Sequence, residues 1–428
     1  MSTDSKAQLV RFLRWSERYT KTDMVYLASG GFWSTIAQVV ESLTIFGLAI
    51  LVAHFLPKEI YGEYKYIIAT VALISSFSLT GLGSAVFQSV ASGYDGSLAA
   101  GFRATLRWSA LAVLGAFALA AYYFLHGNTA LGMGMLIGGS LSPLLTAANL
   151  GNTFLSAKKD FKRSALYFGL LDTVFVTGAL AVTVLIAPNT LALIAVYFAA
   201  NTLSTFWFYR RVVRLYRPDP THTDPGMLSY AKHLSLMGIL NGIAGNIDQV
   251  LLFHFVGPVQ LAIYNFAIAI PDQTKGPLKT LDTMLQARFV SRSDTEIRTS
   301  MRNKMLWLFI SSMIFIGAYI VLAPYFYRIF FPNYIDSIFY SQVYVCAQLG
   351  LVFWPASSYL SARKRVREQY IVTVGVAAFQ IGVMVIGVLS AGLLGLIIAR
   401  VISRISGPAF AHGLYRMTDR PGVYNEQQ

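Results

Sequence analysis

The sequence contains little charge for its length. Only 13% of its 428 residues are charged, whereas an ordinary soluble protein has roughly 25%. Hydrophobic residues make up 55%, and the mean hydropathy is +0.55. Because this composition extends along the whole chain, it excludes an ordinary soluble domain and predicts a protein that crosses a membrane many times.

Cysteine is almost absent as well. The single Cys346 excludes an internal disulfide and a cysteine-ligated metal cluster. The sequence also lacks a zinc-ligand spacing, a phosphate-cradling Walker motif and a Ser–His–Asp set that can be placed. Without a Walker motif a self-contained ATP-driven pump is disfavoured, and no cofactor is expected. The polar and basic residues 1–23 are unlike a cleavable signal peptide.

Long apolar runs are abundant. A membrane-spanning helix needs about 20 residues, and twelve segments supply them. We therefore expect an all-α polytopic membrane protein with twelve transmembrane helices, at 27–56, 65–90, 104–125, 130–157, 164–187, 190–209, 233–256, 259–287, 304–323, 338–361, 369–390 and 392–414.

The distribution of Lys and Arg predicts the orientation. With the N-terminus in the cytoplasm, the outside loops contain only Lys58, Lys65 and Arg328 of the 34 basic residues. Four more lie within spans, and the rest lie in cytoplasmic segments. Since cytoplasmic loops carry the excess of Lys and Arg, both termini are expected in the cytoplasm. The net charge of +14 then reflects topology, and no nucleic-acid partner is expected.

An internal repeat divides the chain. Residues 53–69 align without gaps on 253–269, and 155–162 align on 360–367 at nearly the same offset. The two six-helix halves are then parallel repeats, related by a pseudo-two-fold axis along the membrane normal. The predicted parts are a cytoplasmic segment 1–26, a first half 27–209, a linker 210–232, a second half 233–414 and a cytoplasmic tail 415–428.

The eighth predicted span carries four charges. Asp272, Lys275, Lys279 and Asp282 follow steps of three and four residues, which places them on one face of a helix. Ionisable groups inside a membrane face a wet cavity or each other, so they indicate a functional site. The alternative is that Asp272 pairs with Lys275 and Lys279 with Asp282, or that Lys279 snorkels to the interface.

Three deep basic residues are candidates for an anion site. Arg404 lies near the middle of the last span and Arg400 one turn away, while Lys275 lies between Pro271 and Pro277. Each proline invites a bend, and transporters often place sites at broken helices. The arginine fork suits bidentate phosphate binding. Alternatively, both arginines pair with acidic residues on neighbouring helices.

Two acidic residues are candidates for ion coupling. Glu41 lies three residues after Gln38 in the first span, and Asp248 lies among amide side chains in the seventh. A buried carboxylate can exchange a proton at workable pH, or bind Na⁺ together with amide oxygens. The alternative is a structural hydrogen bond between helices. Asp272 joins this candidate set.

The chain resembles the multidrug/oligosaccharidyl-lipid/polysaccharide exporter superfamily, and within it the Wzx-type polysaccharide flippases. The resemblance rests on residues 31–64, 80–91 and 246–267 and covers essentially the whole chain. It implies a V-shaped pair of six-helix bundles in the bacterial inner membrane. It also implies transport of an undecaprenyl-pyrophosphate-linked oligosaccharide from the inner to the outer leaflet, coupled to an H⁺ or Na⁺ gradient. Membrane lipids and other glycan-assembly proteins are the implied partners.

Within that expectation the second half holds the pyrophosphate. Lys275, Arg400 and Arg404 are the predicted anion ligands, with Lys279 near the cytoplasmic boundary. Their first-half equivalents by the repeat offset are uncharged. The first half is expected to contribute polar groups suited to sugar hydroxyls or to coupling, namely Gln38, Asn149 and Asn152.

Two other function classes fit the sequence less well. An organic-cation antiporter of the same superfamily needs an acidic cavity, and the deep basic residues count against it. A membrane polymerase or ligase of the glycan pathway needs a large outside loop with catalytic charges. The longest outside loop here, 324–337, is short, so no enzymatic activity is expected.

Overall fold

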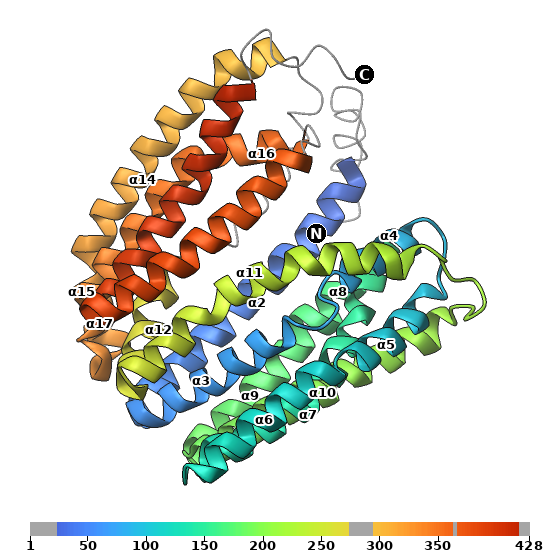
Figure 1. Cartoon of the computed structure of the whole chain (residues 1–428), viewed down its shortest axis with the longest axis horizontal. Helices are drawn as coiled ribbons and strands as arrows, with labels where there is room; N and C mark the ends of the chain where they lie inside the picture. The colour runs from blue at the N-terminus through green and yellow to red at the C-terminus, as the bar shows by residue number, and fades with distance from the viewer. Residues whose placement is uncertain (1–23, 274–293, 363–365, 419–428) are drawn as a thin grey trace, which may run out of the picture.

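The computed structural model describes residues 24–273, 294–362 and 366–418, and there the chain is built of helices without a strand (Figure 1). The first half forms α2 (Met24–Phe55), α3 (Lys58–Ser75), α4 (Leu82–Ala91), α5 (Ser97–Trp108), α6 (Ala110–Leu125), α7 (Thr129–Ala157), α8 (Phe161–Ser164), the π-helix η1 (Ala165–Leu171), α9 (Asp172–Ile186) and α10 (Thr190–Tyr216). The second half forms α11 (Met227–Phe255), α12 (Pro258–Asp272), α14 (Asp294–Phe330), η2 (Pro332–Tyr334), α15 (Ser337–Tyr344), η3 (Val345–Phe353), α16 (Trp354–Ala362) and α17 (Val366–Thr418). The predicted all-helical membrane fold is confirmed.

Each predicted span contains helix in its described residues, but not every one is a complete crossing. In the described residues eight helices are long and apolar enough to cross a membrane, or nine if the bent α11 counts as one span. One of the eight, Ile371–Tyr415, contains two predicted spans. Its backbone reverses at Ala391 and at Gly392, where φ is 55°. The count of twelve stays a prediction, because α3 and α4 are separate helices and α12 is described only to its end at Asp272.

The predicted span 65–90 is broken, which the sequence reading missed. Helix α3 ends at Ser75 and α4 begins at Leu82. Two of the intervening hydroxyls bond the backbone, with Ser76 Oγ donating to Ala72 O at 3.0 Å and Ser78 Oγ to Ser75 O at 2.6 Å. Residues 76–81 form a non-helical connection between the two helices.

Helix ends follow the internal repeat. Helices α2 and α11 end at Phe55 and Phe255, and α3 and α12 begin at Lys58 and Pro258. The two equivalent helices α3 and α12 pack against each other. Their approach at Gly62 is so close that a Cβ there would lie 2.0 Å from Pro258 O, so only glycine fits without a backbone shift.

The helices form two arms that converge at one end and diverge at the other (Figure 1). Helices α2 to α10 make the first arm and α12 to α17 the second. Helix α11 runs along the first arm against α3 and α4, and it also packs against α17. One apolar cluster extends from α2 and α3 into α12, α14 and α17, so a continuous core joins the arms where they converge.

Specific contacts close the converging end. Lys58 Nζ lies 2.9 Å from Asp336 Oδ2, and Asn333 Nδ2 donates to Ala53 O at 2.9 Å. Phe46 of α2 packs against the rings of Phe330 and Phe331 at the end of α14. Each contact joins the first half of the chain to the loop that follows α14.

The connection between the halves is docked on the first arm. Helix α10 extends to Tyr216 and α11 begins at Met227, so residues 217–226 form the non-helical connection between the halves. Gly96 N donates to His222 O at 3.0 Å, and Ser89 Oγ donates to Asp224 Oδ2 at 2.7 Å. These bonds hold the linker against the turn between α4 and α5.

Candidate functional site

The two deep arginines lie on the second part of α17, one turn apart. Arg400 faces Asp248 on α11, and Arg404 faces Asp272 at the end of α12. The consecutive helices α11 and α12 and the much later α17 thus bring two carboxylates and two guanidinium groups together. This arrangement agrees with the alternative that both arginines pair with acidic residues on neighbouring helices.

Arg400 and Asp248 form a buried ion pair. The Asp248 side chain is 0% exposed and that of Arg400 is 12% exposed. Tyr264 OH donates a hydrogen bond to Asp248 Oδ2, and its ring lies 5.9 Å from Arg400 Cζ. Asp248 Oδ1 and Arg400 Nε have no hydrogen-bond partner among the described residues. In this conformation the guanidinium of Arg400 therefore neutralises the charge of the Asp248 carboxylate.

Arg404 is held more loosely. Its Nη2 lies 3.6 Å from Asp272 Oδ1, and its side chain is 36% exposed. Tyr344 OH donates to the same Asp272 oxygen at 2.8 Å. Arg404 lines two adjoining cavities of about 470 and 440 Å³, which also share Gln380. Arg400 also lines the smaller of these cavities, but its side chain is 12% exposed against 36% for Arg404, so Arg404 presents more of its charge to open space.

Three of the four charged residues of the eighth predicted span fall in a part of the chain that the structure does not describe. Lys275, Lys279 and Asp282 lie outside the described residues, as does Pro277. Helix α12 ends at Asp272, directly after Pro271. Whether the four charges of the eighth span share one helical face therefore stays a prediction.

Gln38 and Glu41 lie apart from the arginine cluster. Both are exposed on α2, and neither lines the two cavities that contain Arg404. Helix α2 packs against α9 and η1 of the first arm. Glu41 is thus not brought to Asp248, the other predicted coupling carboxylate.

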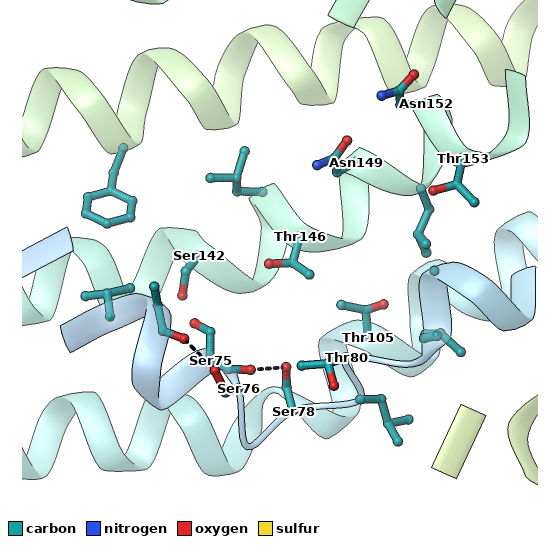
Figure 2. Close-up of a pocket in the computed structure, with 18 of the residues that line it drawn as sticks. Ser75, Ser76, Ser78, Thr80, Thr105, Ser142, Thr146, Asn149, Asn152 and Thr153 are labelled. Carbon is teal, nitrogen blue, oxygen red and sulfur yellow. Dashed lines mark hydrogen bonds between the residues drawn. The ribbon is translucent and has the colours of Figure 1, made fainter. Parts of the chain in front are cut away.

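A third cavity of about 660 Å³ lies in the first arm (Figure 2). It opens between α3, α5, α7 and α10, beside the break between α3 and α4. The predicted residues Asn149 and Asn152 both line it. Asn152 Oδ1 accepts a hydrogen bond from Ser164 Oγ at 2.6 Å. The structure therefore brings these two predicted residues together, but not with Gln38.

Sequence reasoning missed most of this wall. Ser142, Thr146 and Thr153 join Asn149 on one face of α7 and line the same cavity (Figure 2). Their spacing of three to four residues was the available signal, since such residues share a helix face. Tyr264 and Tyr344 were also missed as partners of the acidic residues, and nothing in the sequence points to those contacts.

The fold is that of a membrane transporter. An inward-facing multidrug resistance MATE family transporter of the MOP superfamily is similar, with a TM-score of 0.71 and 14% identity, over 90% of this chain and 97% of that one. An outward-facing one has a TM-score of 0.60 and 16% identity, over 91% and 95%. A MOP superfamily transporter from Pyrococcus furiosus, described as having a binding pocket of reverse polarity, scores 0.61 with 16% identity over 91% and 95%.

Sequence similarity assigns the chain to a narrower group, a protein family. The polysaccharide biosynthesis protein family matches residues 27–270, more than half of the chain. The protein belongs to this family, which confirms the predicted resemblance to the polysaccharide branch of the superfamily. No curated protein matches the chain by sequence.

Proposed function

We propose that this protein moves an undecaprenyl-pyrophosphate-linked oligosaccharide from the inner to the outer leaflet of the bacterial cytoplasmic membrane. The observation that carries the proposal is Arg404, a partly exposed guanidinium that lines two cavities within a multi-pass membrane protein. Membership of the polysaccharide biosynthesis family and the fold of a transporter support it.

The role of Arg404 follows from the cost of moving charge. A pyrophosphate cannot cross a hydrocarbon core of about 30 Å without compensating charge along a wet path. Arg404 can offer two parallel N–H donors to phosphate oxygens. Its present carboxylate contact is 3.6 Å long, beyond an ordinary hydrogen bond, so the anion can compete with Asp272.

Ion coupling follows from the same competition. A proton on Asp272 would remove the charge that faces Arg404 and so favour phosphate binding. Asp248 is less available, because Arg400 already neutralises it. We therefore assign coupling to Asp272, with H⁺ as the ion, and leave Glu41 as an exposed carboxylate of α2 outside this exchange.

The arrangement of the two arms suits a state that is open to the cytoplasm and can accept substrate from that side. They diverge at the end where the basic cytoplasmic segments are predicted (Figure 1). The higher TM-score with the inward-facing transporter, 0.71 against 0.60 for the outward-facing one, supports the same interpretation. Substrate would enter from the cytoplasmic leaflet while its lipid tail stays in the bilayer, and both termini would be cytoplasmic.

Removal of the Arg404 charge tests the proposal. We expect Arg404→Gln to abolish display of the glycan at the cell surface at normal protein levels, because the pyrophosphate loses its counter-charge. Arg404→Lys should retain part of the display, since the charge stays but the fork is lost. Arg210→Gln is the matched control, because Arg210 packs on Phe206 away from the cavities. Normal display by Arg404→Gln would overturn the proposal.

Export of an organic cation is the second candidate, since two of the similar structures are multidrug transporters. An acidic cavity would be needed to attract a cation. The first-arm cavity is lined by no Asp or Glu, and Asp272 in the second arm already faces Arg404. Cells that express the protein should therefore retain ethidium as cells without it do.

A further inference from the structure

The first-arm cavity is polar without being charged. In the part of the chain that the structure describes, its lining residues include no Lys, Arg, His, Asp or Glu. The polar part of its wall consists of hydroxyls and side-chain amides, from the segment around the α3–α4 break on one side and from α7 on the other (Figure 2).

Much of this polar wall has no hydrogen-bond partner among the residues that the structure describes. Six lining side chains form no hydrogen bond with another described residue, namely Ser75, Thr80, Ser142, Thr146, Asn149 and Thr153. Elsewhere in the described chain, intramembrane hydroxyls usually bond a carbonyl of the preceding turn, as Thr183 does with Ala179 O at 2.8 Å. Hydroxyls and amides that the protein leaves unpaired are available to a ligand or to water.

The hydroxyl and amide groups that line the cavity indicate which class of ligand it can bind. Neutral donors and acceptors on two facing surfaces match the hydroxyl groups of a carbohydrate, which both donate and accept. An apolar drug would leave these groups without partners at a cost in affinity, and an ionised ligand would find no counter-charge. A volume of about 660 Å³ lies within the usual range of roughly 300–1,000 Å³ for small-molecule sites.

The cavity is separate from the anion site in both position and chemistry. It lies within the first arm, whereas Arg404 lies on α17 of the second arm. A lipid-linked glycan has the same two chemistries, an anionic pyrophosphate followed by sugars.

We propose that the first-arm cavity is a glycan subsite that binds uncharged sugar residues of the substrate, with Thr146 and Asn149 on α7 as its central ligands. This inference rests on the proposed function. It adds that the sugars are selected in the first arm, by hydroxyl and amide groups, while the second arm holds the pyrophosphate. A glycan whose first sugars are acidic is then a poor substrate.

Binding to the full-length protein in lipid nanodiscs tests the subsite. The probes are undecaprenyl pyrophosphate alone, the same lipid with a neutral hexose disaccharide, and the same lipid with a hexuronic acid disaccharide. For the natural protein we expect the neutral disaccharide to lower the dissociation constant about tenfold, the size expected for two neutral hydrogen bonds. The acidic disaccharide should give no such gain.

Variants separate the two subsites. Thr146→Val with Asn149→Leu should abolish the gain from the neutral disaccharide and leave binding of the bare lipid unchanged. Thr183→Val, which removes a hydroxyl outside the cavity, should keep the gain. Arg404→Gln should weaken binding of all three lipids equally and keep the gain, so failure of the anion site and failure of the glycan subsite are distinguishable.

Three results would overturn the inference. They are no gain from neutral sugars, a gain that survives in Thr146→Val with Asn149→Leu, and an equal gain from the acidic disaccharide. Each variant is first checked for an unchanged unfolding temperature. Where Thr146→Val with Asn149→Leu does not fold, Ser75→Ala with Ser142→Ala removes two hydroxyls from the same cavity and the same outcomes decide.

Discussion

Arg400 and Asp248 are buried together, and this makes each dependent on the other. Taking two charges out of water is costly, and mutual attraction offsets that cost only while both are present. Tyr264 adds a hydrogen bond to the carboxylate. The pair joins α11, which runs along the first arm, to α17 of the second arm, so it acts at a contact that alternating access would have to preserve or break.

Single and double substitutions should therefore differ. We expect Arg400→Gln or Asp248→Asn alone to destabilise the protein by about 3–5 kcal/mol, because a buried charge is left without a partner. The double variant should recover much of the loss. Heat-induced unfolding in detergent, followed by size-exclusion chromatography, measures this.

A more exposed pair provides the control. The side chains of Lys158 and Asp95 are 30% and 29% exposed, so Lys158→Gln should cost about 0–1 kcal/mol. Equal stability of the two single variants and the natural protein would contradict the assigned role of the Arg400–Asp248 pair.

Among the elements, the helical run from Phe161 to Ile186 begins at a well-defined cap. Asp160 Oδ1 accepts from Arg163 N at 3.1 Å, and Asp160 Oδ2 accepts from Tyr216 OH at 2.6 Å. The Arg163 guanidinium pairs with the same carboxylate. Partial burial acts to raise the pKa of Asp160, but the hydrogen bonds from Tyr216 and Arg163 outweigh it and hold the pKa below its ordinary value.

A carboxylate with a lowered pKa stabilises the fold in its ionised form. Its contribution is fully present above the ordinary value of about 3.9 and is lost as the pH falls through the lower value of the folded state. We expect Asp160→Ala to cost about 1 kcal/mol at neutral pH, as loss of an N-cap does. The unfolding temperatures of the two proteins should converge in acid.

The comparison variant is Asp160→Asn, which keeps a side-chain cap but cannot ionise. Its unfolding temperature should vary less with pH than that of the natural protein. If the difference between the natural protein and Asp160→Ala stays constant down to pH 3, the carboxylate charge is not what stabilises this helix start.

For the whole molecule, the contacts at the converging end hold the two arms together. The arms are joined there by the Lys58–Asp336 ion pair, by the bond from Asn333 to Ala53 O and by the packing of Phe46. The proposed transport by alternating access requires these contacts to break when the arms exchange positions. Their combined strength therefore sets the population of the opposite state.

Weakening the closure should shift that population. We expect Lys58→Gln with Asn333→Ala to favour the state open at the converging end, because one ion pair and one hydrogen bond contribute about 1–2 kcal/mol. Spin labels at His222 and Asn303, with Cys346→Ser, report the distance between the arms at the diverging end. The short-distance population should rise, and an unchanged distribution would count against this closure.

The orientation in the membrane is tested at the same scale. A cysteine at His222, in the linker, should be labelled only after the membrane is made permeable. A cysteine at His126, in the loop between α6 and α7, should react in intact cells. Both are made with Cys346→Ser. The reverse pattern would mean that the termini are outside and would overturn the orientation predicted from Lys and Arg.

The positions of the helices, the internal repeat and the polysaccharide branch of the superfamily could be read from the sequence. Each depends only on the order of residues along the chain. The length of an apolar run and the offset between two similar segments can be read without knowing which helices pack together. The break between Ser75 and Leu82 was missed, because the apolar runs on its two sides together reach the length of one span. Asn149 and Asn152 were identified because amides inside an apolar run are conspicuous, whereas serine and threonine are not.

Only the tertiary structure decided which charges face which. Arg400 and Arg404 look alike in the sequence, yet Arg400 is paired with the buried Asp248 and reaches one cavity, whereas Arg404 is more exposed and lines two. The same holds for the hydroxyls, because only packing decides whether a serine or threonine bonds its own helix or faces empty space. These outcomes depend on the rotation and register of helices far apart in the chain, which hydrophobic periodicity does not specify when every face of a helix is apolar.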